Sequence, residues 1–151
     1  MGAGFLETAA PASADLILVL EVVIGLGLLL GAVLARKKRY RAHAWCQSSI
    51  VLLNLVLIAV AMFPSFHGRV LPKIPQKLHR SFYALATAHA ALGSLAEAAG
   101  LYVVLAAGTN ILPQRLRMTN YKVWMRSVLL LWWLALLLGL ATYIHWYLPH
   151  F

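Results

Sequence analysis

The sequence is poor in acidic residues, in cysteine and in charge of any kind. Only 11% of its 151 residues are charged, with 13 Lys and Arg against 4 Asp and Glu, and Cys46 is the single cysteine. Soluble domains carry about a quarter charged residues, so the composition excludes a water-soluble protein. One cysteine excludes an internal disulfide and a paired-cysteine redox motif. The motifs of serine hydrolases, P-loop proteins, zinc proteases and dinucleotide-binding enzymes are missing too, and we expect no enzymatic activity.

Long apolar runs are what the chain has in abundance. Hydrophobic residues make up 62% of it, and the mean hydropathy is +0.80. In lipid a backbone must satisfy its hydrogen bonds within its own segment, so runs of about 20 apolar residues are read as membrane-spanning helices. No Lys or Arg precedes the first run, which favours a span over a cleaved signal peptide. We predict an all-α integral membrane four-helix bundle, a single transmembrane domain over 1–151 with spans at about 15–35, 45–66, 82–107 and 123–148.

The basic residues lie in the connectors between these runs. Nine Lys and Arg follow spans one and three, four follow span two, and both termini have none. The positive-inside rule therefore predicts a multi-pass protein of the cell inner (cytoplasmic) membrane with both termini on the outer side. Between spans, the net charge of +9 is expected to meet anionic lipid and not nucleic acid. The outer connector, HGRVLPKIPQKLHR, contains two prolines and is expected to be an ordered loop with little regular structure.

Ionisable side chains inside the spans are the candidate functional residues, because an unpaired charge or imidazole in lipid is costly. His67, His89 and His145 are predicted to gather from three helices in the outer third of the bundle. Imidazole nitrogens bind copper and haem iron, so these three are the predicted metal ligands. Glu21 lies at the depth of His89, and we predict a cofactor-binding role for it and for His43. For His67 and His145 an interfacial position among water and headgroups is the alternative.

One face of the third span combines small and polar residues at helical spacing. It contains His89, Gly93, Glu97 and Gly100, in a span rich in alanine. Small residues allow helices to approach closely, so this face is predicted to point into the bundle. We expect Gly93 and Glu97 to be structural, with Glu97 paired to Arg126 at the inner end of span four. A proton or haem-propionate role for this pair is the alternative.

Four segments that each contain a histidine follow one another along the chain: AHAWCQ with His43, PSFHG with His67, TAHAALG with His89, and TYIHWYL with His145. Their order resembles the CtaM/YozB-like family of small four-helix bacterial membrane proteins. The resemblance covers about 36–148, although an alanine-rich third span and a longer, more basic outer loop depart from the family pattern. It implies a part in maturing a haem-copper terminal oxidase, at its copper or haem centre.

Three hypotheses follow for function. In the first, the protein is an oxidase assembly factor in which His67, His89 and His145 hold a metal, copper above all, near the outer face and pass it to an oxidase subunit. In the second, two of these histidines bind haem b, and the protein is an electron-transferring b-type cytochrome. In the third, it is an accessory structural subunit of a respiratory complex. The sequence leaves the choice between copper and haem b open.

Overall fold

The computed structural model describes residues 4–148, which are mostly helical with no strand among them. Four helical segments are long and apolar enough to cross a membrane, as predicted. The boundaries lie within a few residues of the predicted ones, except that the second segment is much longer than expected. The segments are α1 (Ala12–Arg36), the run from α2 to α4 (Tyr40–Lys77), α5 (Ser81–Gly108) and α6 (Tyr121–Tyr147).

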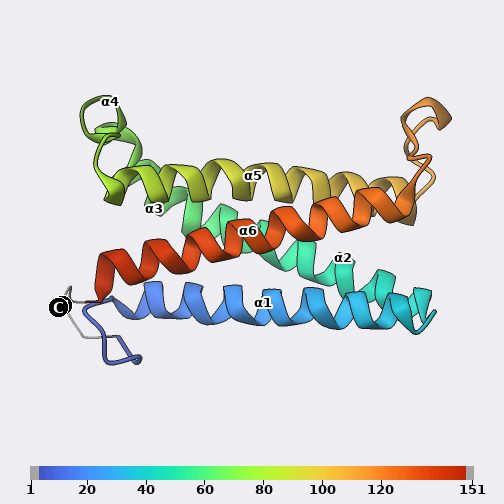
Figure 1. Ribbon diagram of the computed structural model, residues 1–151, viewed down its shortest axis with the longest axis horizontal. Helices are drawn as coiled ribbons and strands as arrows, with labels where there is room; N and C mark the ends of the chain where they lie inside the picture. The colour runs from blue at the N-terminus through green and yellow to red at the C-terminus, as the bar shows by residue number, and fades with distance from the viewer. Residues whose placement is uncertain (1–3, 149–151) are drawn as a thin grey trace.

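The second segment changes its helical form halfway. α2 (Tyr40–Leu57) passes into a π-helical turn, η1 (Ile58–Met62), and continues as α3 (Phe63–Arg69). Pro64 lies in the first turn of α3, where it has no N–H to donate and its ring crowds the preceding turn. A wider π turn accommodates both effects. After this turn α3 lies well away from α1, whereas α2 begins beside it (Figure 1).

The connector after α3 contains more regular structure than predicted. It forms a 3-10 turn, η2 (Leu71–Lys73), and a short helix, α4 (Ile74–Lys77). The expectation of little regular structure was wrong because each proline stands in the first turn of a short helix. At that position the missing N–H would have had no helical partner, so proline starts these turns instead of breaking them.

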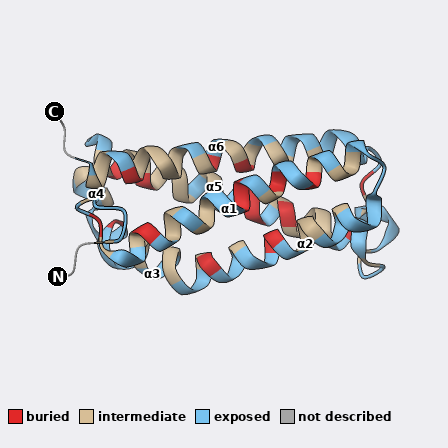
Figure 2. Cartoon of the chain, turned by 90° about the horizontal axis from the view of Figure 1, so that it is seen from below, coloured by how far each residue is buried: buried red, intermediate tan, exposed pale blue. Residues whose placement is uncertain are grey.

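The helices form one bundle in which α1 packs against α2 and α6, and α5 packs against α6 and α2. The first and last described residues lie at one end, together with α4, and we call this the terminal end (Figures 1 and 2). The α1–α2 turn and the loop at 109–120 lie at the other end, which we call the hairpin end. A hydrogen bond from the Ala9 N–H to the Tyr147 carbonyl, at 3.3 Å, joins the segment before α1 to the last residue of α6.

The outer surface of the bundle is apolar. Figure 2 shows few buried residues and long exposed stretches on every helix. One large apolar side chain from each span illustrates this: Leu26 is 60% exposed, Val60 73%, Leu95 56% and Leu130 61%. In water so continuous an apolar surface would drive association, whereas lipid solvates it. The exposure pattern therefore supports a multi-pass membrane protein.

Two apolar clusters hold the helices together. The first includes Leu28, Val51 and Trp132 and joins α1, α2, α5 and α6. The second, at the terminal end, is built on Val70, Tyr83 and Ala86. Between these clusters the packing of the bundle is interrupted, and the candidate site lies there.

Candidate functional site

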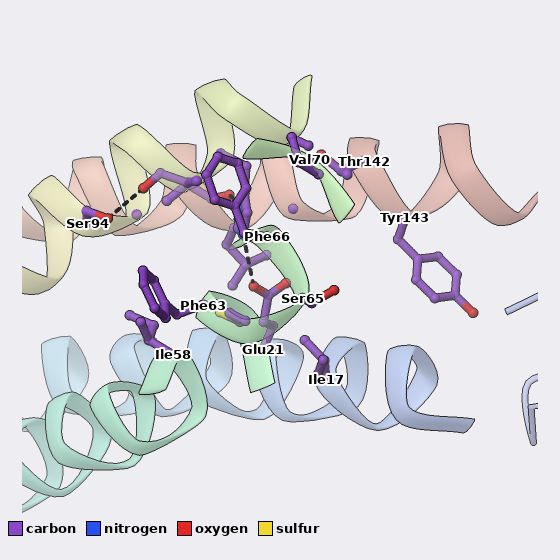
Figure 3. Close-up of a pocket in the computed structure, with 18 of the residues that line it drawn as sticks. Ile17, Glu21, Ile58, Phe63, Ser65, Phe66, Val70, Ser94, Thr142 and Tyr143 are labelled. Carbon is purple, nitrogen blue, oxygen red and sulfur yellow. Dashed lines mark hydrogen bonds and ion pairs between the residues drawn. The ribbon is translucent and has the colours of Figure 1, made fainter. Parts of the chain in front are cut away.

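A cavity of about 580 Å³ lies in the half of the bundle nearer the terminal end. Its lining includes members of both apolar clusters and comes mainly from α1, α3, α5 and α6. Its walls are mostly apolar and include the aromatic rings of Phe63 and Phe66 (Figure 3). The Trp132 ring belongs to the same lining. After the π turn α3 lies away from α1, so these two helices do not close on each other and the cavity lies between them.

Glu21 of α1 and His89 of α5 meet inside this cavity. His89 Nε2 lies 3.5 Å from Glu21 Oε1, and the two side chains are 23% and 12% exposed, respectively. Figure 3 shows the Glu21 carboxylate turned away from α1 into the cavity. The structure thus brings together two of the residues that the sequence singled out, on the two helices and at the common depth expected for them.

The backbone fixes the state of the His89 ring. His89 Nδ1 lies 2.9 Å from the Ala135 carbonyl of α6, which can only accept, so Nδ1 carries a hydrogen. In a neutral ring Nε2 is then an acceptor, and it faces the Glu21 carboxyl group. An acceptor and a carboxylate would repel each other, so a proton lies on one or the other group. The Glu21–His89 pair therefore carries a proton, on His89 Nε2 or on the Glu21 carboxyl group.

Gly139 of α6 makes this contact possible. A Cβ at Gly139 would lie 2.8 Å from both Glu21 Oε2 and His89 Cε1, which is closer than real Cβ contacts allow. Sequence reasoning missed this residue. The available signal was a single glycine in the leucine-rich run of the last span.

Three hydroxyl groups around the cavity are already engaged. Thr87, Ser94 and Thr142 each donate to the carbonyl of the residue four positions earlier in their own helix, at 2.7, 2.8 and 2.7 Å. Such bonds satisfy a hydroxyl hydrogen locally. Glu21 and His89, together with the Ser65 hydroxyl, therefore remain as polar groups that a ligand in the cavity can meet.

Tyr143 borders the cavity toward the terminal end, where a hydrogen-bond network closes the bundle. Its hydroxyl donates to Oδ1 of the fully buried Asp15, at 2.5 Å, and lies 2.8 Å from Thr8 Oγ1. Asp15 Oδ2 accepts from the Leu6 N–H at 2.9 Å. This network attaches the segment before α1 to α6. Sequence reasoning missed it, although an acidic residue at the start of an apolar run was a signal.

The other two predicted metal ligands lie outside the cavity. His67 is exposed on α3, with its ring centroid 5.8 Å from that of Phe63. His145 Nε2 lies 3.0 Å from Ser81 Oγ at the α5–α6 contact. His67 comes one position after a residue of the cavity wall, and His145 comes one position before another. One position along a helix turns the side chain by about 100°. Their neighbours Phe66 and Trp146 line the cavity instead.

The predicted three-histidine metal site is therefore not assembled. Across residues 4–148 no three His, Cys, Asp or Glu side chains are arranged to hold one ion. Of the predicted ligands, only His89 lines the cavity. His43, predicted to assist cofactor binding, lies at the hairpin end with Nδ1 2.8 Å from the Gly31 carbonyl. The donor set does not fit a copper ion bound by three imidazoles.

The predicted ion pair between Glu97 and Arg126 is wrong. Glu97 is buried, and its Oε2 accepts from Asn54 Nδ2 at 2.9 Å. Arg126 is exposed. Trp132 Nε1 donates to the Ala96 carbonyl at 2.8 Å, so Trp132 lies level with Glu97. Arg126 is six residues further toward the hairpin end, or about 9 Å along the helix.

The inward orientation predicted for the small-residue face of α5 is confirmed. At Gly100 a Cβ would lie 3.3 Å from Trp132 Nε1 and from Val51 Cγ2, so the helices approach closely here. Gly93 borders the cavity, and apart from its own helix backbone no atom of the described residues lies within 4 Å of where its Cβ would be. Gly100 therefore serves close packing, whereas Gly93 adds space to the cavity.

Similarity to known proteins gives no independent indication of what this site binds. Comparisons with protein-family models, with curated proteins and with solved structures give no match to the chain. A function is therefore inferred from the chemistry of the cavity.

Proposed function

We propose that the protein binds an apolar ligand with a hydrogen-bonding head group, which enters the cavity from the bilayer and contacts the Glu21–His89 pair. The observation that carries this proposal is an ionisable pair placed in an otherwise apolar cavity. Ligand sites are commonly apolar pockets with a few polar groups that orient the ligand. Ionisable residues at membrane depth are costly and mark such sites.

A quinone or quinol head group suits this pair best. When the side of the pair that faces the cavity carries the proton, it can donate a hydrogen bond to a quinone carbonyl. When that side carries no proton, it can accept a hydrogen bond from a quinol hydroxyl. Phe63, Phe66 and Trp132 offer aromatic surfaces for a flat ring. An isoprenoid tail would remain among the apolar side chains and the lipid.

The test is the binding of a short-chain quinone to the purified protein in detergent. Glu21→Gln and His89→Gln each remove one ionisable member of the pair, and we expect affinity to fall about tenfold or more. Ser94→Ala is the matched control, because Ser94 lines the same cavity but donates to the Ala90 carbonyl. Wild-type affinity in both pair variants, or an equal loss in the control, would contradict the proposal.

Haem b is a second candidate, favoured by the bond between His89 Nδ1 and the Ala135 carbonyl. Metal-bound histidines commonly donate the hydrogen of the other ring nitrogen to a carbonyl or carboxylate, which leaves Nε2 for the metal. Glu21 would have to move aside for iron to reach Nε2. A visible spectrum tests this directly: a Soret band that shifts on reduction and disappears in His89→Ala supports haem, and a spectrum without such a band rejects it.

A wider role in assembling a haem-copper oxidase follows from the sequence resemblance. In that role the partner would be an oxidase subunit in the bacterial cytoplasmic membrane, with both chain termini on the outer side. The bundle has an apolar surface, and the first and last described residues both lie at its terminal end, which is compatible with this arrangement. Co-purification with an oxidase subunit, and loss of oxidase activity in cells lacking the protein, would support it.

A further inference from the structure

Within residues 4–148 the cations at the hairpin end have no acidic partners. Nine of the 13 Lys and Arg lie in 36–41 and 115–126, whereas the four Asp and Glu occupy positions 7, 15, 21 and 97. Among the described residues the one ion pair is Glu21–His89, in the other half of the bundle. The excess positive charge at the hairpin end must therefore be balanced by anions from outside the chain.

Part of this charge surrounds a shallow pocket at the α1–α2 turn. Lys38 adopts a left-handed backbone, with φ of 57°, and reverses the chain sharply between the two spans. Tyr40 is 64% exposed and Trp45 is 70% exposed. Tyrosine and tryptophan in such positions lie at the level of lipid headgroups. The residues that line the pocket are Lys38, Arg39, Tyr40, Arg41, Ala42 and Trp45.

We propose that this pocket binds the phosphate of an anionic phospholipid headgroup. Arg39 and Arg41 can each present two N–H groups to phosphate oxygens, and the Lys38 ammonium adds a third cation. Trp45 lies less than two turns after the start of α2, and its ring would pack along the glycerol and the upper part of an acyl chain. A zwitterionic lipid offers the same phosphate together with its own cation, so the pocket favours a lipid of net negative charge. This inference does not depend on what the central cavity binds.

Native mass spectrometry of the full-length protein in detergent can measure this preference. The probes are phosphatidylglycerol and phosphatidylcholine with identical acyl chains. A cation near a lipid surface favours anionic lipid by about fivefold, so the triple variant Lys38→Gln, Arg39→Gln, Arg41→Gln should lose about a hundredfold in preference. The matched control changes three exposed cations at the terminal end, Arg69→Gln, Lys73→Gln and Arg80→Gln, and should keep the wild-type preference.

Two further measurements keep the outcome decisive. Arg39→Gln alone should lower the preference for phosphatidylglycerol about fivefold, even if the triple variant fails to fold. Glycerol 3-phosphate, which has the phosphate but no acyl chains, should not displace the bound lipid. Displacement by glycerol 3-phosphate would indicate a site for soluble phosphates and overturn the proposal. Equal retention of both lipids by the wild type, or equal loss in the two triple variants, would overturn it as well.

Discussion

At the residue scale, Gly139 decides whether two ionisable side chains can meet inside the membrane. Its missing Cβ leaves the space that Glu21 and His89 occupy. The common depth of Glu21 and His89 could be predicted from the sequence, because the rise per residue of a helix is fixed. Their contact could not, because it depends on a gap in a third helix that lies beside both of them.

Gly139→Ala should therefore separate the Glu21–His89 pair. We expect a destabilisation of about 1–3 kcal/mol from overpacking and a loss of quinone affinity of about tenfold or more. Equilibrium unfolding in detergent and the binding assay measure the two effects. Gly108→Ala is the control, because in the described part of the chain only its own backbone lies within 4 Å of its Cβ position. Identical behaviour of the two variants would show that Gly139 has no part in positioning the pair.

Two adjacent tryptophans in α6 provide a second test at this scale. Trp132 Nε1 donates to the Ala96 carbonyl at 2.8 Å, whereas Trp133 Nε1 is buried without a partner. Substitution by phenylalanine removes the indole N–H at either position, but only Trp132→Phe takes a hydrogen bond away from a carbonyl, that of Ala96. We expect Trp132→Phe to lower the free energy of unfolding by about 1–2 kcal/mol more than Trp133→Phe does. Equal losses in the two variants would mean that the bond to Ala96 contributes nothing.

At the element scale, the four spans could be predicted because lipid leaves helices as the only way to satisfy the backbone. The π turn at Ile58–Met62 could not. Pro64 signals a disturbance of the helix, but whether a helix kinks or widens there depends on its neighbours. A π turn rotates everything after it by about 100° relative to a continuous α-helix. For this reason the direction of the His67 side chain could not be predicted from sequence periodicity.

Deleting Ala59 should remove the extra residue of the π turn and rotate α3 by about 100°. Phe63 and Phe66 would then leave the cavity wall, and we expect quinone affinity to fall by about tenfold or more while the helical content from circular dichroism is unchanged. Ala59→Leu keeps the register and lies on an exposed position, so it serves as the control. Undiminished affinity in the deletion variant would mean that α3 does not shape the binding site.

At the scale of the whole molecule, charge and apolar surface define how the protein lies in the bilayer. Lys and Arg concentrate at the hairpin end, and the exposed large side chains along the spans are apolar. Composition alone predicted this class of protein, because neither feature depends on which residues touch. The interior differs: Glu97 bonds to Asn54 and not to Arg126, a choice that depends on the relative rotation of three helices.

The orientation in the membrane can be measured with single cysteines. In a Cys46→Ser background, His79→Cys lies in the exposed connector at the terminal end and Gln114→Cys in the exposed loop at the hairpin end. The positive-inside rule predicts that an impermeant thiol reagent labels position 79 in intact cells and position 114 only after permeabilisation. The opposite labelling pattern would place the basic hairpin end outside.

The most direct test of the central cavity is photolabelling of the reconstituted protein with a photoreactive quinone, followed by mass spectrometric mapping. Binding between the helices predicts label in two separate segments, the α3 peptide with Phe63 and Phe66 and the α5 peptide with His89 and Gly93. Both should be suppressed by unlabelled quinone and by the Gly139→Ala substitution. Label confined to lipid-facing positions such as Leu26 and Leu130, and insensitive to competitor, would contradict a binding site around Glu21 and His89.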